Sequence, residues 1–214
     1  MNLNEAAQAI SATLIGGENS GNVAFCGVST DSRKIGAGQL FVALRGENFD
    51  GHEFLETAIA SGAVAALVAA DAVALLNEIA LPLLVVEDTR LALGSLAAAW
   101  RSRFVLPLIA VTGSNGKTTS KEMIASILQA THGDTVLATQ GNFNNDIGLP
   151  LTLLTLDSQH RAAVIEMGMN HPGEIAYLAR IAKPTVALVT NAQRAHLAGM
   201  GSIETIAAEK GSVF

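Results

Sequence analysis

The sequence predicts an α/β protein of two domains, built mostly on parallel sheets. Three observations predict this class. Short apolar runs alternate with segments of helical periodicity, glycine-rich turns separate them, and an apolar run at 106–111 leads through a glycine loop straight into a helical pattern. Half of the 214 residues are hydrophobic and 15% are charged, so the chain can bury a substantial core and is not of the disordered class.

The first domain is expected to span residues 1–88. Its pattern predicts a helix at 4–14, strands at 23–28 and 39–44, a helix at 52–61, a strand at 63–68, a helix at 71–79 and a strand at 83–86. An amphipathic helix at 89–104 is expected to lead into the second domain. No linker rich in proline or serine marks the change, so we place the boundary near residue 88.

The second domain is expected to span residues 89–214 and to continue the same alternation. After the strand at 106–111 and its helix, we expect strands at 136–139, 162–167 and 186–190 and helices at 148–154, 173–181 and 202–211. The chain stops within the last helical pattern, and four strands are few for such a sheet. We therefore expect a fragment of a longer protein.

The loop at 112–119 reads TGSNGKTT and has the composition of a phosphate-binding loop. Gly113 and Gly116 allow the backbone N–H groups to turn inward around an anion, and the following helix N-terminus adds partial positive charge. Lys117 would reach the outer phosphates and the Thr118 hydroxyl would ligate Mg²⁺. Nucleotide contacts are expected from Gly113, Ser114, Asn115, Gly116, Lys117, Thr118 and Thr119. Val111 stands where the usual G-x-x-x-x-G-K-[ST] pattern has glycine, so a plain turn with a surface lysine is the alternative interpretation.

Polar residues follow the other strands of this domain. They are the asparagine-rich loop at 140–146, Glu166 near the end of its strand, and the segment 191–196. Ligands of open parallel sheets bind outside the carboxyl ends of the strands. We therefore expect these residues to meet the glycine loop at one edge of the sheet, where the Glu166 carboxylate offers hard oxygen atoms to Mg²⁺.

Charge and cysteine content exclude several classes of protein. The net charge is −6 and the 13 Lys and Arg residues do not cluster, so no nucleic-acid partner is expected. Cys26 is the single cysteine, which fits a reducing cytoplasm, and we expect it to be a small core residue. The N-terminus lacks the regions of a signal peptide, and the apolar stretch 58–76 is too interrupted to span a membrane. We expect a cytoplasmic protein.

Five motifs resemble the Mur ligase family. They are 112–119 (TGSNGKTT), 141–150 (GNFNNDIGLP), 165–175 (IEMGMNHPGEI), 29–33 (STDSR) and 41–50 (FVALRGENFD). The resemblance runs from residue 29 to residue 210. It implies a small α/β uridine-substrate domain followed by a truncated P-loop α/β ATPase domain, with the family's C-terminal Rossmann-like domain absent from these residues.

The resemblance implies an ATP- and Mg²⁺-dependent ligase of peptidoglycan precursor synthesis. ATP would phosphorylate a carboxylate of the UDP-linked peptide, and an amine would attack the acyl phosphate. The asparagine loop and the His-Pro-Gly-Glu run favour the member that joins UDP-N-acetylmuramoyl-tripeptide to D-Ala-D-Ala, and we expect a monomer. Two alternatives stay open: a member that adds a single amino acid, and a non-catalytic module that binds the UDP-substrate. The fragment alone is expected to be inactive, since closure by a further domain often assembles such sites.

The resemblance also implies roles for single residues. Catalytic roles fall to Lys117, Glu166, His196 and Lys210, with Lys210 carried as a carbamate, and the metal ligands would be Thr118, Glu166, His196 and Lys210. Substrate contacts are implied for Ser29, Thr30, Asp31, Arg33, Asn142, Asn144 and Asn145. This chain departs from the family's pattern around His196, where it carries Arg194, Ala198 and Met200, so the surroundings of the second metal ion are expected to differ.

Overall fold

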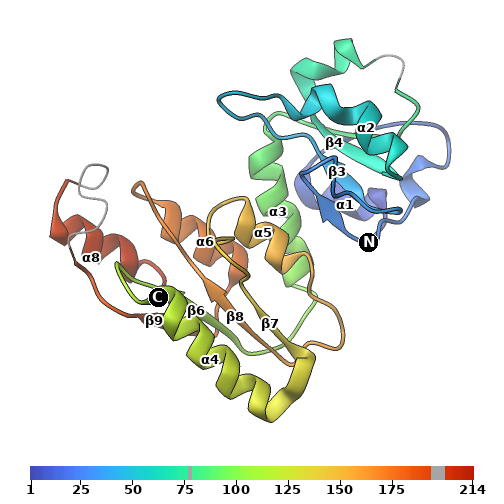
Figure 1. Ribbon diagram of the computed structural model, residues 1–214. Coiled ribbons are helices and arrows are strands. Elements are labelled where there is room, and N and C mark those ends of the chain that lie inside the picture. Colours follow the sequence, from blue (N-terminus) through green and yellow to red (C-terminus); the bar gives the residue numbers. More distant parts are fainter. Residues whose placement is uncertain (77–78, 194–200) are drawn as a thin grey trace. The chain divides into compact units, whose positions relative to one another are not determined.

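The computed structural model of the chain (Figure 1) describes residues 1–76, 79–193 and 201–214. Its internal contacts divide it into two compact units, Met1–Leu96 and Ala97–Phe214. The division falls inside the helix α3 (Thr89–Arg101), whereas the boundary inferred from the sequence lies just before this helix.

The first unit is built on a sheet of mixed direction. Its strands are β1 (Thr13–Ile15), β2 (Val28–Ser29), β3 (Leu40–Val42), β4 (Ala65–Ala69) and β5 (Leu83–Val86). Among the described residues the order is β1-β5-β4-β3-β2, with β1 antiparallel to β5 and the other pairs parallel. The helical elements are α1 (Leu3–Ile10), η1 (Ser20–Asn22), η2 (Gly51–Phe54), α2 (Leu55–Ala60) and η3 (Ala70–Leu75). All residues of β3 and β4 are buried, as parallel strands covered on both faces require.

Several sequence-based expectations for this unit are wrong. The helix expected at 4–14 ends at Ile10, because Ser11 adopts a left-handed conformation (φ 54°) and the following residues pair with β5 as a strand. The strand expected at 23–28 reduces to β2, and the helix expected at 71–79 is the short 3-10 helix η3. Cys26 is exposed and is not a core residue. For the first helix, long-range pairing with β5 overrides the local pattern.

The second unit contains a parallel sheet. Its strands are β6 (Leu108–Thr112), β7 (Val136–Ala138), β8 (Ala162–Glu166) and β9 (Val186–Val189), in the order β7-β8-β6-β9 within the described residues. Its further helical elements are α4 (Lys117–His132), η4 (Gly133–Thr135), α5 (Gly148–Leu153), α6 (Glu174–Ala182) and α8 (Ile203–Gly211). The mostly parallel α/β class predicted from the sequence is confirmed.

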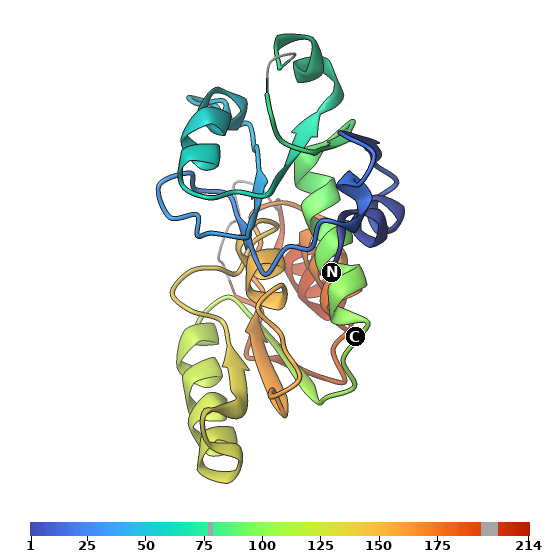
Figure 2. The ribbon, with the colours of Figure 1, turned by 90° about the vertical axis from the view of Figure 1, so that its right-hand side faces the viewer.

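The sheet of the second unit is the middle layer of three (Figure 2). Val111 packs with Ala125 of α4 on one face. Ile165 belongs to the larger core on the other face, together with Leu149 of α5 and Leu178 of α6. The helices on both faces leave the carboxyl ends of the strands open, which is where the polar loops gather.

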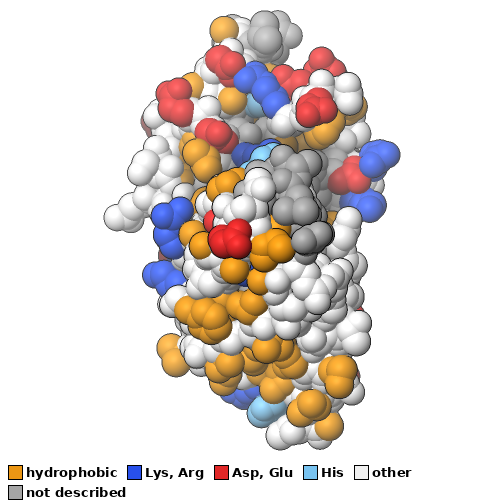
Figure 3. Space-filling view, turned by 90° about the vertical axis from the view of Figure 1, so that its left-hand side faces the viewer, with side chains coloured by type: hydrophobic (Ala, Val, Ile, Leu, Met, Phe, Trp, Pro, Cys, Tyr) orange, Lys and Arg blue, Asp and Glu red, His pale blue; other side chains and the backbone are white. Residues whose placement is uncertain are grey.

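Part of the α4 side of this sheet is exposed. Met123 and Ile127 of α4 are 62% and 67% exposed, and Val186 and Leu188 of β9 are 55% and 38% exposed. Figure 3 shows hydrophobic side chains gathered on the surface of this unit. No helix in the described ranges is both long and apolar enough to cross a membrane.

Candidate active site

The loop between β6 and α4 needs glycine at two positions. Gly113 has φ 147°, and a Cβ there would lie 1.9 Å from Thr190 Oγ1. Gly116 has φ 76° in the left-handed region and precedes the first residue of α4. The loop can therefore turn sharply from the strand into the helix only with these small residues.

The segment after β9 holds the glycine loop in place. The Ser114 N–H donates to Asn191 O (3.0 Å), and the Asn115 N–H donates to Asn191 Oδ1 (3.1 Å). Ser114 Oγ donates to Gln193 O (3.0 Å), and Thr190 Oγ1 donates to Asn115 O (2.7 Å). These bonds join two strand ends far apart in sequence, so the loop is pre-organised. Gln193 was not among the site residues predicted from the sequence.

Lys117 lies over the loop that precedes it. Its Nζ donates to Gly113 O (2.9 Å) and Ser114 O (3.4 Å), and the side chain is half-buried. The ammonium group is thus held beside the backbone that would surround an anion. Thr118 and Thr119 follow in the first turn of α4, and both are exposed.

Glu166 is the buried carboxylate at the end of β8. The residue is 2% exposed, its Oε2 accepts from Thr118 Oγ1 (2.9 Å) and its Oε1 accepts from Asn144 Nδ2 (2.8 Å). A buried carboxylate requires such donors. Since the Thr118 hydroxyl and a Glu166 oxygen lie side by side, the pair offers the hard oxygen ligands that Mg²⁺ takes.

The described residues contain no cluster of three or more His, Cys, Asp or Glu that could hold a metal ion. This finding is compatible with Mg²⁺, which keeps several water ligands and binds through one or two protein oxygens and substrate phosphates. The donor set at Thr118 and Glu166 therefore fits that ion.

Two residues that were not predicted from the sequence help to hold Glu166 in place. The Glu166 N–H donates to Thr139 Oγ1 (2.9 Å), at the point where the chain leaves β7. Lys121 of α4 is 1% exposed, and its Nζ donates to Thr139 O (2.8 Å) and to Glu122. A lysine in a helix is usually exposed, so its sequence gives no sign of this buried role.

The three asparagines of the loop after β7 have different surroundings. Asn144 contacts Glu166, and its carbonyl accepts from the Gly168 N–H (2.8 Å). Asn145 Oδ1 accepts from the Gly148 N–H (2.8 Å), so this side chain satisfies a backbone donor at the start of α5. Asn142 is exposed. The described contacts thus link this loop to Glu166 through Asn144, whose N–H also donates to Asn142 O (2.7 Å).

Lys210 of α8 is 2% exposed. Burial, and after it the nearby ammonium of Lys117, lowers the pKa of Lys210 to about 8. The neighbouring Glu209 accepts hydrogen bonds from the Gly173 and Ile175 N–H groups, both at 2.8 Å, and so ties α8 to the start of α6. His196, together with Arg194, Ala198 and Met200, lies outside the described residues.

The first unit has a cavity of about 560 Å³, lined by Thr30, Asp31, Ser32, Arg33, Phe41, Phe49, Gly51, Phe54 and Thr57. Of the four first-unit residues expected at the substrate, Thr30, Asp31 and Arg33 are in this lining. The fourth, Ser29, supports it from outside, because its Oγ accepts from the Asp31 N–H (3.2 Å). The aromatic side chains Phe49 and Phe54 were not among the site residues predicted from the sequence.

Asp31 and Arg33 form a two-point ion pair at this cavity. Arg33 Nε lies 2.9 Å from Asp31 Oδ1, and Nη2 lies 3.0 Å from Oδ2. The hydrogen bonds from Arg33 lower the pKa of Asp31 to about 2. The cavity wall therefore carries a fixed carboxylate and a guanidinium beside aromatic rings.

The fold and the glycine loop define the second unit as a member of the P-loop α/β class. Comparison with known families is more specific: the model for the "Mur ligase family, catalytic domain" matches residues 25–101, and that for the "Mur ligase middle domain" matches residues 111–214. This chain belongs to the Mur ligase family.

Similar curated proteins are named UDP-N-acetylmuramoyl-tripeptide–D-alanyl-D-alanine ligase. That of Haemophilus influenzae is 48% identical over 210 residues, covering 97% of this chain and 44% of the relative. That of Escherichia coli is 48% identical over 202 residues, covering 94% and 43%. The chain spans less than half the length of these relatives.

Solved structures show the same relationship. A crystal structure of MurF from Acinetobacter baumannii superposes with a TM-score of 0.84 at 38% identity, covering 99% of this chain and 45% of that one. MurF from Thermotoga maritima, solved in complex with ADP, gives 0.75 at 34% identity, covering 87% and 42%.

Proposed function

We propose that this chain carries the substrate-binding and nucleotide-binding parts of an ATP-dependent ligase of peptidoglycan precursor synthesis. The reaction joins D-Ala-D-Ala to UDP-N-acetylmuramoyl-tripeptide through an acyl phosphate. The observation that carries the proposal is the contact of Glu166 with Thr118 and Asn144, because it unites three strand ends beside the glycine loop. The names of relatives at 48% identity support the dipeptide over a single amino acid as the incoming group.

In this proposal the glycine loop binds the phosphates of ATP. Its N–H groups and the start of α4 face the anion, and Lys117 exchanges its contacts with Gly113 O and Ser114 O for phosphate oxygens. Phosphoryl transfer depends chiefly on positioning and on neutralising charge, which these groups supply. The ADP complex of the Thermotoga maritima neighbour supports nucleotide binding.

Thr118 and Glu166 are the residues that would hold Mg²⁺. When bound, the ion supplies positive charge beside the transferred phosphoryl group. Asn144 keeps the second Glu166 oxygen in a fixed direction, and Thr139 fixes the backbone beneath it. Mg²⁺ ligation is also proposed for His196 and for a carbamate on Lys210.

A carbamate on Lys210 requires the neutral amine. A pKa of about 8 leaves part of the Lys210 population uncharged near neutral pH. The amine nitrogen attacks the carbon of CO₂, a nitrogen–carbon bond forms as one carbon–oxygen π bond breaks and leaves its electron pair on oxygen, and the nitrogen releases one proton to solvent. The product is an anionic group with two oxygens, which is suited to Mg²⁺.

The cavity of the first unit would take the uridine end of the substrate. Phe49 and Phe54 provide apolar surface for a planar base, and Arg33 provides positive charge for a diphosphate. A second candidate function is supported by the extent of the chain, which spans less than half of its relatives: these residues alone would bind the substrate without turning it over.

Calorimetric titration of the 214-residue chain tests the proposal. The ligands are UDP-N-acetylmuramoyl-tripeptide and ATP with Mg²⁺, and Lys117→Ala is compared with the control Arg180→Ala, at an exposed cation of α6. We expect Lys117→Ala to abolish ATP binding and to leave binding of the uridine substrate intact. ATP binding without any response to the UDP-peptide would overturn the assignment of the first unit.

A further inference from the structure

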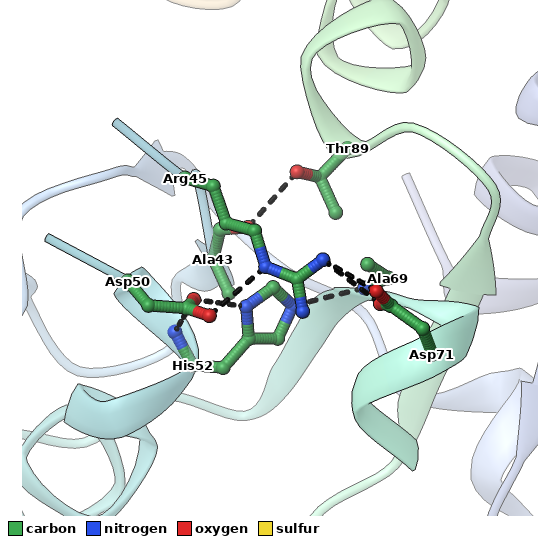
Figure 4. Close-up of polar contacts among 7 residues, drawn as sticks. All are labelled: Ala43, Arg45, Asp50, His52, Ala69, Asp71 and Thr89. Atoms are coloured by element: carbon green, nitrogen blue, oxygen red, sulfur yellow. Dashed lines mark hydrogen bonds and ion pairs between the residues drawn. The ribbon is translucent and has the colours of Figure 1, made fainter. Parts of the chain in front are cut away.

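Four charged or polar residues form a connected cluster in the first unit, outside the lining of the cavity. They are Arg45, Asp50, His52 and Asp71 (Figure 4). Arg45 and Asp50 stand at the two ends of a loop, where they form an antiparallel bridge, and Asp71 lies on η3. The cluster thus connects this loop and the start of η2 with η3.

His52 ties Asp50 to the end of β4. Its Nε2 accepts from the Ala69 N–H (3.0 Å), so the ring proton is on Nδ1 and donates to Asp50 Oδ1. The same Oδ1 also accepts from the His52 N–H (3.0 Å). His52 is 8% exposed, and both of its ring nitrogens have a hydrogen-bond partner. One oxygen of Asp50 is therefore fully engaged in holding the start of η2.

The other oxygen of Asp50 closes the loop. Arg45 Nε donates to Asp50 Oδ2 (2.9 Å), and Arg45 Nη1 donates to Asp71 at 2.7 Å and 2.9 Å. Burial raises the pKa of Asp50, but the hydrogen bonds from His52 and Arg45 outweigh it and lower that pKa to about 2. The carboxylate is thus charged at any working pH, so its bonds to Arg45 and His52 do not depend on pH there.

The closed loop carries an aromatic wall of the cavity. Phe49 directly precedes Asp50, lines the cavity and is 57% exposed. Its carbonyl accepts from the Gly46 N–H (2.9 Å), and a Cβ on Gly46 would lie 2.4 Å from Phe49 Cε1, so the ring lies against the backbone at the other end of the loop. Gly51, on the other side of Asp50, also lines the cavity.

We propose that Asp50 and Arg45 are positioning residues for the cavity. They hold the loop closed, so that Phe49 stands ready as a wall for the base of a nucleotide-linked substrate. An exposed ring on a loose loop would have to be ordered at binding, which costs affinity. The inference rests on the proposed function, because it assumes that the cavity takes a nucleotide.

Asp50→Asn separates the two roles of this carboxylate. The amide keeps an oxygen for both donors of His52 but presents an NH₂ group to Arg45 Nε, so the side-chain link across the loop is lost while the start of η2 stays held. Asp71→Asn, at a more exposed position, weakens only the link of Arg45 to η3. Asp157→Asn is the matched control in the second unit, where Asp157 binds His160 Nδ1 (2.8 Å) in a similar local arrangement.

Two measurements are made on each variant of the 214-residue chain. Binding of UDP is measured by calorimetry, and the loop is observed by ¹⁹F NMR of protein labelled with 4-fluorophenylalanine, with Phe49→Leu assigning the resonance. For Asp50→Asn we expect about fivefold weaker UDP binding and a shifted or broadened Phe49 resonance, with Phe104 in the second unit unchanged. Asp71→Asn should give smaller changes of the same kind, and Asp157→Asn none.

Unchanged UDP affinity in a folded Asp50→Asn protein would overturn the inference, whatever the NMR spectrum shows. If Asp50→Asn does not fold, Asp71→Asn decides: an unmoved Phe49 resonance with wild-type affinity contradicts the proposal. Failure of the wild-type chain to bind UDP would remove the proposed role of the cavity itself. That result is distinguishable, because it appears before any substitution is made.

Discussion

The Thr118 hydroxyl lies 2.9 Å from Glu166 Oε2, although 48 residues separate the two in sequence. Thr118 belongs to the first turn of α4 and Glu166 is the last residue of β8. The contact therefore shows that the sheet places the start of α4, directly after the glycine loop, against the buried carboxylate. In the function proposed above, an Mg²⁺ ion would use the same two oxygens. Loss of either should be felt most strongly in Mg²⁺-dependent nucleotide binding.

Glu166→Gln should weaken ATP binding in the presence of Mg²⁺ by about tenfold or more, because it removes the charge that an ion requires. The shape of the side chain is kept, so UDP binding should not change. Titration with ATP in Mg²⁺ and in EDTA measures the difference. Glu204→Gln, at an exposed residue of α8, is the control, and an Mg²⁺ effect equal to that of the wild type would contradict the role of Glu166.

Lys121→Met should lower the free energy of unfolding by about 1–3 kcal/mol, since the Thr139 carbonyl loses its donor inside the protein. Urea denaturation followed by circular dichroism measures this change. The same substitution at the exposed Lys34 should stay within about 0.5 kcal/mol of wild type. Equal stability of the two variants would show that the buried ammonium contributes nothing net.

The two loop glycines should differ in their tolerance of alanine. Gly116→Ala meets no atom of the described residues within 4 Å, so only its left-handed backbone is penalised, by about 1–2 kcal/mol. Gly113→Ala also forces its Cβ onto Thr190 and should cost more. Urea denaturation compares the two. A Gly113→Ala protein as stable as Gly116→Ala would contradict the close approach of the strand ends.

The ion pair of Asp31 with Arg33 should make the stability of the protein depend on pH in the acid range. The folded pKa of Asp31 is lowered to about 2 from an ordinary 3.8, so the stabilisation is complete above pH 4 and is lost as the pH falls through 2. Arg33→Gln should move the pKa of Asp31 back toward 3.8. NMR titration of the Asp31 carboxyl carbon measures both values, with Asp157 as an internal reference. No upward movement in the variant would contradict the assigned cause.

Lys210 should form a carbamate in bicarbonate buffer. A ¹³C resonance of the carbamate is expected with labelled bicarbonate, because the lowered pKa supplies the neutral amine. Lys210→Ala should lose this resonance and Lys34→Ala should keep it. A resonance that survives in Lys210→Ala would place the modification elsewhere.

Local sequence was sufficient for much of this fold. The strand expected at 83–86 is β5, and the apolar run around Ile109 is the central strand β6, because both are continuous apolar runs bounded by turn signals. The helix expected at 4–14 was wrong beyond Ile10, where pairing with β5 makes a strand of Thr13–Ile15. No local pattern encodes that partner.

The residues of the candidate site also divide into some that could be predicted from the sequence and some that could not. The glycine loop and Glu166 could be found because a glycine-rich turn between strand and helix, and a carboxylate at a strand end, are both typical of ligand sites on parallel sheets. The role of Lys121 could not be predicted from the sequence, since its burial depends on how α4 lies over β7. The role of Phe49 could not be predicted either, because an aromatic residue in a loop indicates a cavity only when the residues of the opposite wall are known.

The exposed apolar residues of β9 have a practical consequence for work with these 214 residues. In the part of the chain that the structure describes, β9 pairs only with β6, and Val186 and Leu188 are exposed on it. A strand with free peptide groups and apolar side chains is a template for pairing with another chain. We therefore expect the 214-residue chain to self-associate as its concentration rises. Leu188→Lys should make the chain more soluble without changing the glycine loop.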